Sequence, residues 1–255
     1  MMVVATLGRW KKIGQPYLSP LRRMGMDLET EALLFSKTLS RKRRNFKATL
    51  FSEISLKQHR DIQVYGLLSH KVWLELESNR EVADYNEQPK VVQIPCGATV
   101  ISHQFRFAVR KVSGSVEVID IEQKSPEEDV LVENANKEDK RKSIKSWCLN
   151  QEIEYRLITS ESFIGSEIRL SNLRLMLKFM ESVHDVRDVV TEDRINMVVA
   201  SLGPLTVRQI LAELSDSDQA IVIAQLARGI LSERFRAPID RRPFDGTLII
   251  DLAKQ

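Results

Sequence analysis

The sequence contains little cysteine, the residue whose disulfide bonds stabilise many exported proteins. Only two cysteines occur in 255 residues, Cys96 and Cys148, and they form no Cys-x-x-Cys pair. Neither a disulfide framework nor a thiolate zinc site is therefore expected. No apolar run reaches the roughly 20 residues that cross a bilayer, and Met1 to Gly8 lacks the basic flank of a signal peptide. We expect a soluble protein of the reducing bacterial cytoplasm that does not associate with membranes.

Histidine is also scarce, and its four positions, 59, 70, 103 and 184, lack the spacing of metal ligands. We interpret each of these histidines as a surface or core residue. Apolar residues, by contrast, make up 43% of the chain, which is enough to bury a core. The length of 255 residues suits one or two domains.

Positive charge is concentrated at the N-terminus. Residues 1–48 carry eleven lysines and arginines against three acidic residues, a net charge of +8, whereas the whole chain carries +3. The remaining residues must therefore sum to −5. A cationic arm before a mildly acidic body is typical of a segment that lies along phosphates, and a solvated, disordered lead-in is the alternative. Met24 and Met26 also leave open a later start of translation. The densest part of the arm, which we predict to bind DNA, comprises Arg41, Lys42, Arg43, Arg44 and Lys47.

The central part of the sequence alternates between helical and strand patterns. Leu68, Val72 and Leu76 are spaced four apart, as on one face of a helix. Three runs rich in β-branched and aromatic residues follow, and Ser113-Gly114 indicates a hairpin turn between the last two. These patterns predict a helix over 67–77, strands over 91–95, 100–109 and 115–121, a helix over 140–151 and a strand over 155–159. The order predicts an α/β core in which the last strand lies beside the strand over 116–121.

Helical patterns dominate after about residue 170. Ser171 and Asn172 can cap a first helix, which carries Leu173 to Met180, and Thr191 opens a second. Two more helices are expected over 206–214 and 220–235, followed by a strand over 247–252. Three helices and a basic hairpin predict a winged helix-turn-helix, although a three-helix bundle with a trailing strand has the same pattern. We therefore divide the sequence into a basic arm (1–48), an α/β domain (49–168) and an all-helical winged-helix domain (169–255).

A winged unit can bind DNA by placing its last helix in the major groove. The side chains expected to point outward from this helix are Gln219, Gln225, Arg228 and Ser232. Arginines around the hairpin suit phosphate contacts, since the guanidinium group is always charged. The alternative is that the unit docks another protein and that its arginines keep it soluble. The predicted DNA contacts are Arg228, Arg241 and Arg242, with Arg234 and Arg236 beside them.

The strand over 115–121 runs into the sequence Asp120-Ile121-Glu122-Gln123-Lys124. Alternate residues of a strand share one face, so Asp120, Glu122 and Lys124 would lie together. Carboxylate oxygens bind magnesium, and a lysine beside them polarises a phosphate or an attacking water. The pattern indicates a metal-dependent nuclease, with all three as candidate catalytic residues and the two carboxylates as metal ligands. The alternative interpretation is an ordinary polar strand end.

Further motifs extend this pattern into a family resemblance. Glu87-Gln88-Pro89 stands upstream, and Lys124 follows Arg106, the middle residue of Phe105-Arg106-Phe107, by eighteen positions. With these spacings, the sequence from Val64 to Lys124 resembles TnsA, the endonuclease subunit of heteromeric cut-and-paste bacterial transposases. The resemblance covers roughly residues 40–252 and implies a restriction-endonuclease-like N-terminal domain followed by a winged-helix domain. It also implies a mobile-element protein that works in transposition and DNA recombination.

Two positions of this sequence depart from the family pattern. The family's catalytic glutamate, nineteen residues before the position of Gln88, corresponds to Ser69, and its metal-binding aspartate corresponds to Arg106. A serine hydroxyl is a poor magnesium ligand, and an arginine would bring a fixed cation to the metal position. We therefore expect a nuclease fold whose cleavage of the 5′ strand is weak, relocated or lost. Relocated cleavage would need Mg²⁺ or Mn²⁺ and acids drawn from Asp120, Glu122, Glu75 and Glu77.

Three classes of function follow from these patterns. The leading expectation is a TnsA-like transposase subunit that binds transposon-end DNA, an integrase-like transposase subunit and an AAA-type ATPase. The second is a non-enzymatic DNA-binding adaptor or regulator built from the basic arm and the winged domain. The third is a scaffold that contacts only partner proteins.

Overall fold

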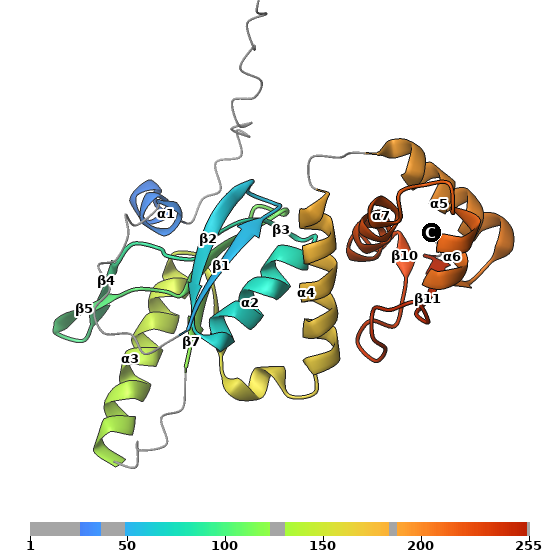
Figure 1. Cartoon of the computed structure of the whole chain (residues 1–255). Coiled ribbons are helices and arrows are strands. Elements are labelled where there is room, and N and C mark those ends of the chain that lie inside the picture. The colour runs from blue at the N-terminus through green and yellow to red at the C-terminus, as the bar shows by residue number, and fades with distance from the viewer. Residues whose placement is uncertain (1–25, 37–48, 123–130, 184–187, 254–255) are drawn as a thin grey trace, which may run out of the picture.

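The N-terminal part of the chain forms a four-stranded sheet with helices on both faces (Figure 1). The computed structural model describes residues 26–36, 49–122, 131–183 and 188–253. The strand order in the sheet is β3 (Val82–Asn86), β6 (Phe107–Lys111), β7 (Val116–Ile121) and β8 (Glu154–Ile158). The first three strands pair antiparallel, and β8 pairs parallel with β7. The predicted pairing of the strand near residue 155 with the strand over 116–121 is thus confirmed.

Helices cover the two faces of this sheet because side chains alternate along its strands. α2 (Leu67–Ser78) packs on the face that carries Phe107 and Ile119. α3 (Leu131–Asn150) packs on the opposite face, which carries Val118. The helix predicted over 67–77 is confirmed, whereas the helix predicted over 140–151 begins earlier than expected. A further helix, α1 (Leu28–Phe35), contributes to the core on the α3 side.

Two hairpins extend from this core. β1 (Leu50–Ser55) pairs antiparallel with β2 (Arg60–Tyr65), and β4 (Val92–Cys96) pairs antiparallel with β5 (Thr99–His103). The strand predicted over 100–109 is wrong as a single element, because the chain leaves β5 before it enters β6. The reason is that Phe105 packs in the core beside α3, whereas Phe107 packs in the core beside α2.

The C-terminal part is mainly helical but not entirely so. It contains α4 (Glu167–Ser182), α5 (Val189–Leu202), α6 (Val207–Glu213) and α7 (Gln219–Leu231). A three-stranded sheet accompanies them in the order β10 (Phe235–Arg236), β11 (Ile249–Leu252) and β9 (Leu205–Thr206), which corrects the expectation of an all-helical domain. The helix predicted over 220–235 ends at Leu231. A side chain at Gly229 would collide with the Phe235 ring, so this glycine lets β10 fold back against α7.

α4 contributes to both hydrophobic cores. Leu170 and Leu177 join the core around α2, whereas Met176 joins the core around α7. Figure 1 shows α4 between α2 and the remaining C-terminal elements. The boundary expected before residue 169 therefore falls inside a helix that both parts share. The N-cap of this helix is Ser166, so Ser171 and Asn172 are not its caps.

In the residues that the structure describes, the chain is a mixed α/β protein with seven α-helices, and helix predominates toward the C-terminus. The central sheet is mixed, since it combines antiparallel pairs with one parallel pair. None of the described helices combines the length and the apolar composition that crossing a membrane requires.

Candidate functional site

Ser69 and Arg106 meet at the N-terminal end of α2. The helix begins after Gly66, whose φ of 88° favours glycine, and Ser69 lies in the first turn with 2% of its surface exposed. Arg106 precedes β6, where its backbone N–H donates to the Ile119 carbonyl oxygen at 2.8 Å. Its side-chain Nε donates to Ser69 Oγ at 2.8 Å, and its Nη2 donates to the Tyr65 carbonyl oxygen. The fold therefore brings together the two positions that the resemblance assigns to metal ligands.

This contact puts a permanent positive charge at the start of α2. A guanidinium group has only hydrogen-bond donors and stays protonated at any physiological pH. The Ser69 hydroxyl oxygen already accepts a hydrogen bond from Arg106. Such a pair suits an anion, for example a phosphate group, and it repels a divalent cation.

Asp120 lies on the opposite face of the sheet, toward α3. Its two carboxylate oxygens lie 2.9 and 3.1 Å from His103 Nε2, and Oδ2 also accepts a hydrogen bond from the Tyr155 hydroxyl at 3.2 Å. Burial, followed by the Asp120 charge, raises the pKa of Tyr155, and the same two causes raise the pKa of Cys148 to about 12. The neighbouring Ile119 packs toward α2 instead. Asp120 therefore belongs to a polar cluster away from the start of α2.

Glu122 shares this face with Asp120 and forms an ion pair with Arg141 of α3. Lys124, the third predicted catalytic residue, lies outside the described residues. The structure thus places the two predicted metal ligands on the α3 face of the sheet. They lie away from the start of α2, where Ser69 contacts Arg106. Among the described residues, no three His, Cys, Asp or Glu side chains form a group that could hold a metal ion.

Glu77 of α2, one of the acids considered for a relocated metal site, makes its hydrogen bonds inside the protein. Its carboxylate accepts hydrogen bonds from Ser55 Oγ at 2.9 Å, from the Lys57 backbone N–H at 2.9 Å and from the Tyr85 hydroxyl at 2.6 Å. Burial, followed by the nearby Glu77 charge, raises the pKa of Tyr85. The carboxylate therefore links α2 to β1 and β3.

The Glu87-Gln88-Pro89 turn also has structural partners. Glu87 accepts hydrogen bonds from both terminal nitrogens of Arg60, at 2.7 and 2.6 Å. This paired contact ties the turn to β2, because a guanidinium fork matches the two oxygens of a carboxylate. The backbone N–H of Gln88 donates to Asn86 Oδ1 at 3.1 Å, which fixes the turn at the end of β3. The motif therefore has a structural role in the described fold.

The dense basic part of the N-terminal arm lies outside the described residues. The residues on either side of it, which end at Ser36 and resume at Thr49, are hydrogen-bonded to the fold. Asn86 Nδ2 donates to the carbonyl oxygens of Leu34 and Ser36, at 2.8 and 3.0 Å, at the end of α1. The Thr49 carbonyl oxygen accepts a hydrogen bond from the Gly66 N–H at 2.8 Å, directly before α2. The chain thus re-enters the described fold beside the helix that carries Ser69. The predicted DNA-binding residues concerned are Arg41, Lys42, Arg43, Arg44 and Lys47.

α7 is the inner helix of the C-terminal part. It packs against α4 and α5, and Gln225, which we predicted to point outward, is only 3% exposed. That prediction is wrong because Val222, Leu226 and Ile230 bury much of the helix surface in the same core. Arg228 is half-buried and donates to the Val183 carbonyl oxygen at 3.4 Å. The helix therefore offers little of its length to a DNA groove.

Two exposed arginines of the C-terminal part, Arg241 and Arg242, lie on the loop between β10 and β11. Asn172 of α4 holds this loop, since its Nδ2 donates to the Ile239 and Arg242 carbonyl oxygens and its Oδ1 accepts from the Phe244 N–H, all at 2.7 Å. Arg241 and Arg242 are both exposed on the loop, and their contact with phosphates stays a prediction. No local pattern identified Asn172 as the residue that fixes them.

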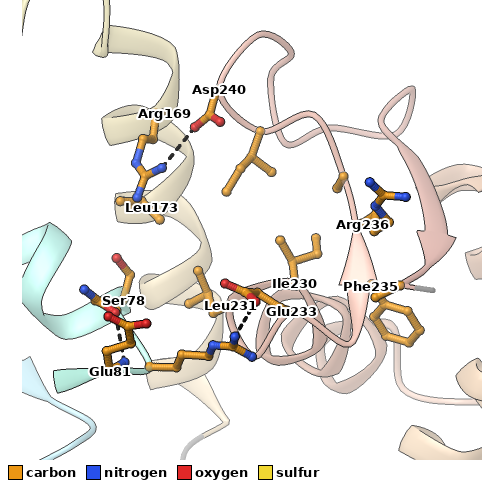
Figure 2. A pocket seen from close by; sticks show the side chains of 15 residues that line it. Ser78, Glu81, Arg169, Leu173, Ile230, Leu231, Glu233, Phe235, Arg236 and Asp240 are labelled. Atoms are coloured by element: carbon orange, nitrogen blue, oxygen red, sulfur yellow. Dashed lines mark hydrogen bonds and ion pairs between the residues drawn. The ribbon is translucent and has the colours of Figure 1, made fainter. Parts of the chain in front are cut away.

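A groove between the two parts of the chain was also missed by the sequence patterns (Figure 2). Its volume is about 540 Å³, and its walls come from the end of α2, from α4 and from the residues after α7. Arg80 pairs with Glu233 across it at 2.7 Å, and Arg169 pairs with Asp240 at 3.2 Å. Figure 2 shows Arg169 pointing toward Asp240. These residues are distant in sequence, so no local motif could have predicted the groove.

Comparison with known proteins gives no matching family model and no matching curated protein. The resemblance to TnsA therefore depends on the motifs and spacings given above.

Proposed function

We propose that this chain is a TnsA-like subunit of a heteromeric DNA transposase that binds transposon-end DNA and partner transposase proteins, with little or no 5′-strand cleavage of its own. The observation that carries this proposal is the hydrogen bond between Arg106 Nε and Ser69 Oγ. The resemblance implies a metal site at these two positions, and their direct contact supports that pairing. A restriction-endonuclease-like class for the α/β part and a winged-helix class for the C-terminal part belong to the same proposal.

A magnesium or manganese ion does not fit this contact. The metal needs several oxygen ligands, whereas Arg106 supplies only donors and Ser69 a single hydroxyl that already accepts a hydrogen bond. No hydrolytic step is therefore assigned to the site. Arg106 brings a permanent positive charge to this point, which would attract a DNA phosphate through its field without cutting the strand.

Two further basic regions support DNA binding. Arg241 and Arg242 are exposed on a loop that Asn172 fixes in place. The cationic segment of the N-terminal arm precedes Thr49, which is bonded beside the start of α2. Phosphate contacts from several such regions add affinity without sequence preference and weaken steeply with salt.

The test combines a binding assay with a nicking assay. The purified chain is incubated with duplex DNA from the ends of its own element, the neighbouring transposase subunit, and Mg²⁺ or Mn²⁺. We expect salt-sensitive binding without nicking by this chain. Replacing Arg241 and Arg242 by glutamine should weaken binding about tenfold, since two phosphate contacts are lost, whereas Arg174→Gln on the exposed side of α4 should not. Metal-dependent nicking that disappears in Lys124→Ala or Asp120→Ala would contradict the proposal.

The second candidate is a non-catalytic DNA-binding adaptor or regulator, which the exposed Arg241 and Arg242 also favour. This function requires DNA binding without partner proteins. If each of the five cations from Arg41 to Lys47 met a phosphate, neutralising them would reduce the log–log salt slope by about 4 to 5. Pull-down of an integrase-like transposase or an AAA-type ATPase, with no binding of DNA alone, would instead favour a scaffold.

A further inference from the structure

A cavity lies between the β4–β5 hairpin and the last turns of α3. Figure 1 shows this hairpin and this helix next to each other, at the end of the molecule opposite to α5, α6 and α7. The volume of the cavity is about 380 Å³, which falls within the roughly 300 to 1,000 Å³ of small-molecule sites. Neither the Ser69 contact nor the groove of Figure 2 shares a residue with it.

Buried contacts fix the two walls of this cavity relative to each other. Ile94 of β4 packs in the same hydrophobic core as Ile144 and Cys148 of α3. Ser143 Oγ of the helix also lies 3.2 Å from Cys96 Sγ at the end of β4. The cavity is therefore formed by the folded core itself, as is usual for a ligand site.

Trp147 gives the cavity an aromatic wall. Its ring stacks on Phe105, with the centroids 6.0 Å apart and the planes at 25°. This contact holds the indole from the inside of the protein, and the rest of the side chain lines the cavity. Pro95 lines the cavity from the hairpin side. An indole and a proline ring on two elements suit a flat, partly apolar ring between them.

Polar groups of α3 line the same cavity and have no partners of their own. Within the described residues, the Trp147 indole N–H, the Ser146 hydroxyl and the Asn150 side-chain amide make no hydrogen bond. Ser146 and Asn150 are exposed, and the Trp147 nitrogen is not among the buried polar atoms that lack a partner, so a ligand can reach all three. They offer both donors and acceptors, which match the mixed edge of a nucleobase.

The hairpin turn leaves the approach to these groups open. Gly97 lines the cavity, and a side chain added there would meet no atom of the chain within 4 Å. A ligand larger than the cavity can therefore extend past the turn. This opening suits one unit of a polymer better than a fully enclosed small molecule.

Lys142 brings a positive charge to the lining of the cavity. Its Nζ lies 3.7 Å from Asp139 Oδ1, and the two side chains are 69% and 75% exposed. The charge is thus compensated in the free protein, but an exposed pair of this kind contributes little to stability. Lys142 can therefore exchange Asp139 for a phosphate, while the aromatic wall and the polar groups provide most of the selectivity.

These features favour an unpaired nucleotide over a base pair. In a duplex, neighbouring bases cover the faces of each base, and its partner occupies the pairing edge. A single strand leaves both free, and its bases stack on aromatic side chains while a cation tracks the backbone.

We propose that this cavity binds an unpaired nucleotide of single-stranded DNA. The base would stack on Trp147 beside Pro95 and present its edge to Ser146 and Asn150, and the adjacent phosphate would contact Lys142. The choice of DNA rests on the proposed function, in which the strand would flank a transposon end. The site itself uses none of the arginines that the proposed function assigns to duplex DNA.

Binding of the full chain to a short labelled oligothymidylate, followed by fluorescence anisotropy, tests the proposal. A strand of the same length with abasic residues keeps the phosphates and lacks the bases. We expect the abasic strand to bind about tenfold more weakly, because the stacking of a base is lost. Equal affinity for the two strands would overturn the proposal. Tighter binding of oligouridylate, or complete displacement by equimolar thymidine 5′-monophosphate, would overturn the assignment to a DNA strand.

Ser146→Phe is the decisive variant, because this exposed position lines the cavity and a phenyl ring there would fill it. We expect it to weaken oligothymidylate about tenfold and to leave the abasic strand unaffected. Leu149→Phe is the matched control, since Leu149 is 77% exposed on the same helix and lies outside the cavity. An unchanged preference for oligothymidylate in Ser146→Phe, or an equal loss in Leu149→Phe, would overturn the proposal.

Duplex binding separates this inference from the proposed function. Ser146→Phe should bind duplex DNA from the transposon ends as the natural chain does, whereas the double replacement of Arg241 and Arg242 should not. A chain that binds oligothymidylate through the cavity but no end duplex would contradict the proposed function and support the cavity. A chain that binds the end duplex but does not distinguish oligothymidylate from the abasic strand would contradict the cavity alone.

Discussion

Arg106 Nε donates to Ser69 Oγ at 2.8 Å, which joins two residues that stand 37 positions apart in the sequence. Because the described residues place no pair of carboxylates at this contact, we expect the protein to melt at the same temperature in Mg²⁺, Mn²⁺ and EDTA, within about 1 °C. A ligand raises the melting temperature only when it binds the folded state preferentially. Scanning calorimetry measures this directly, and a rise of several degrees in either metal would contradict the expectation.

A double variant provides the matching positive control. Ser69→Glu with Arg106→Asp would put two acids where the hydrogen-bonded pair now lies. We expect this variant to be less stable than the natural chain without metal, because two carboxylates repel each other, and to regain stability when Mn²⁺ is added. A variant that folds but shows no response to the metal would indicate that the two positions cannot share an ion.

Asp120 is expected to have a structural role in the described fold. Asp120→Ala would leave the Tyr155 hydroxyl and the His103 ring without their shared acceptor, so we expect a loss of about 1 to 3 kcal/mol in the free energy of unfolding. Denaturant unfolding measures the loss, and Asp120→Asn should lose less because its side-chain oxygen still accepts a hydrogen bond. An unchanged stability together with altered DNA nicking would show that Asp120 acts in catalysis instead.

Lys57 should make stability depend on alkaline pH. Its pKa in the folded protein is about 8 against the ordinary 10.5, so between these values the unfolded chain binds more protons than the folded one. The free energy of unfolding should therefore rise with pH across this window, and the cost of burying the charge is fully present below about pH 8. Because solvent screens the half-buried side chain, we expect a rise of about 1 kcal/mol.

The measurement compares the natural chain with Lys57→Met at about pH 7 and about pH 10, so that other titrating groups cancel. The difference between the two proteins should change in favour of the natural chain at the higher pH. A difference that stays constant would mean that the lysine is as well solvated in the folded chain as in the unfolded one.

We expect Asn172 to contribute both to the stability of the fold and to the affinity for DNA. Asn172→Ala removes three hydrogen bonds that hold the loop carrying Arg241 and Arg242, so we expect a loss of about 2 to 4 kcal/mol in stability. DNA affinity should also fall, although no positive charge is removed. Asn196→Ala is the matched control, since Asn196 Oδ1 accepts no hydrogen bond within the described residues. Equal effects of the two substitutions would refute a specific role for Asn172.

Regular periodicity made much of the fold predictable. α2 and the pairing of β7 with β8 followed from apolar spacing and from strand order. The break between β5 and β6 could not be predicted, because both strands are rich in β-branched and aromatic residues, and tertiary packing separates Phe105 from Phe107. The end of α7 is likewise set by the approach of Phe235 to Gly229, which leaves no signal in a helical pattern.

The candidate site was predictable only in part. Spacing between motifs singled out Ser69 and Arg106, and the two residues do meet. Spacing could not tell which face of β7 carries Asp120, because the first four residues of this strand are buried on both faces and show no polar alternation. The groove between the two parts depends on residues from several distant turns, so it emerges only once the chain has folded.

Because α4 contributes side chains to both hydrophobic cores, it determines how the chain behaves when it is truncated. A fragment that stops before this helix would lose Leu170 and Leu177, and a fragment that starts after it would lose Met176. Each truncated half would expose apolar surface that the intact chain buries, so neither should be stable by itself. The whole protein should accordingly melt in one cooperative transition, and a molecule bound to either half should delay the unfolding of both.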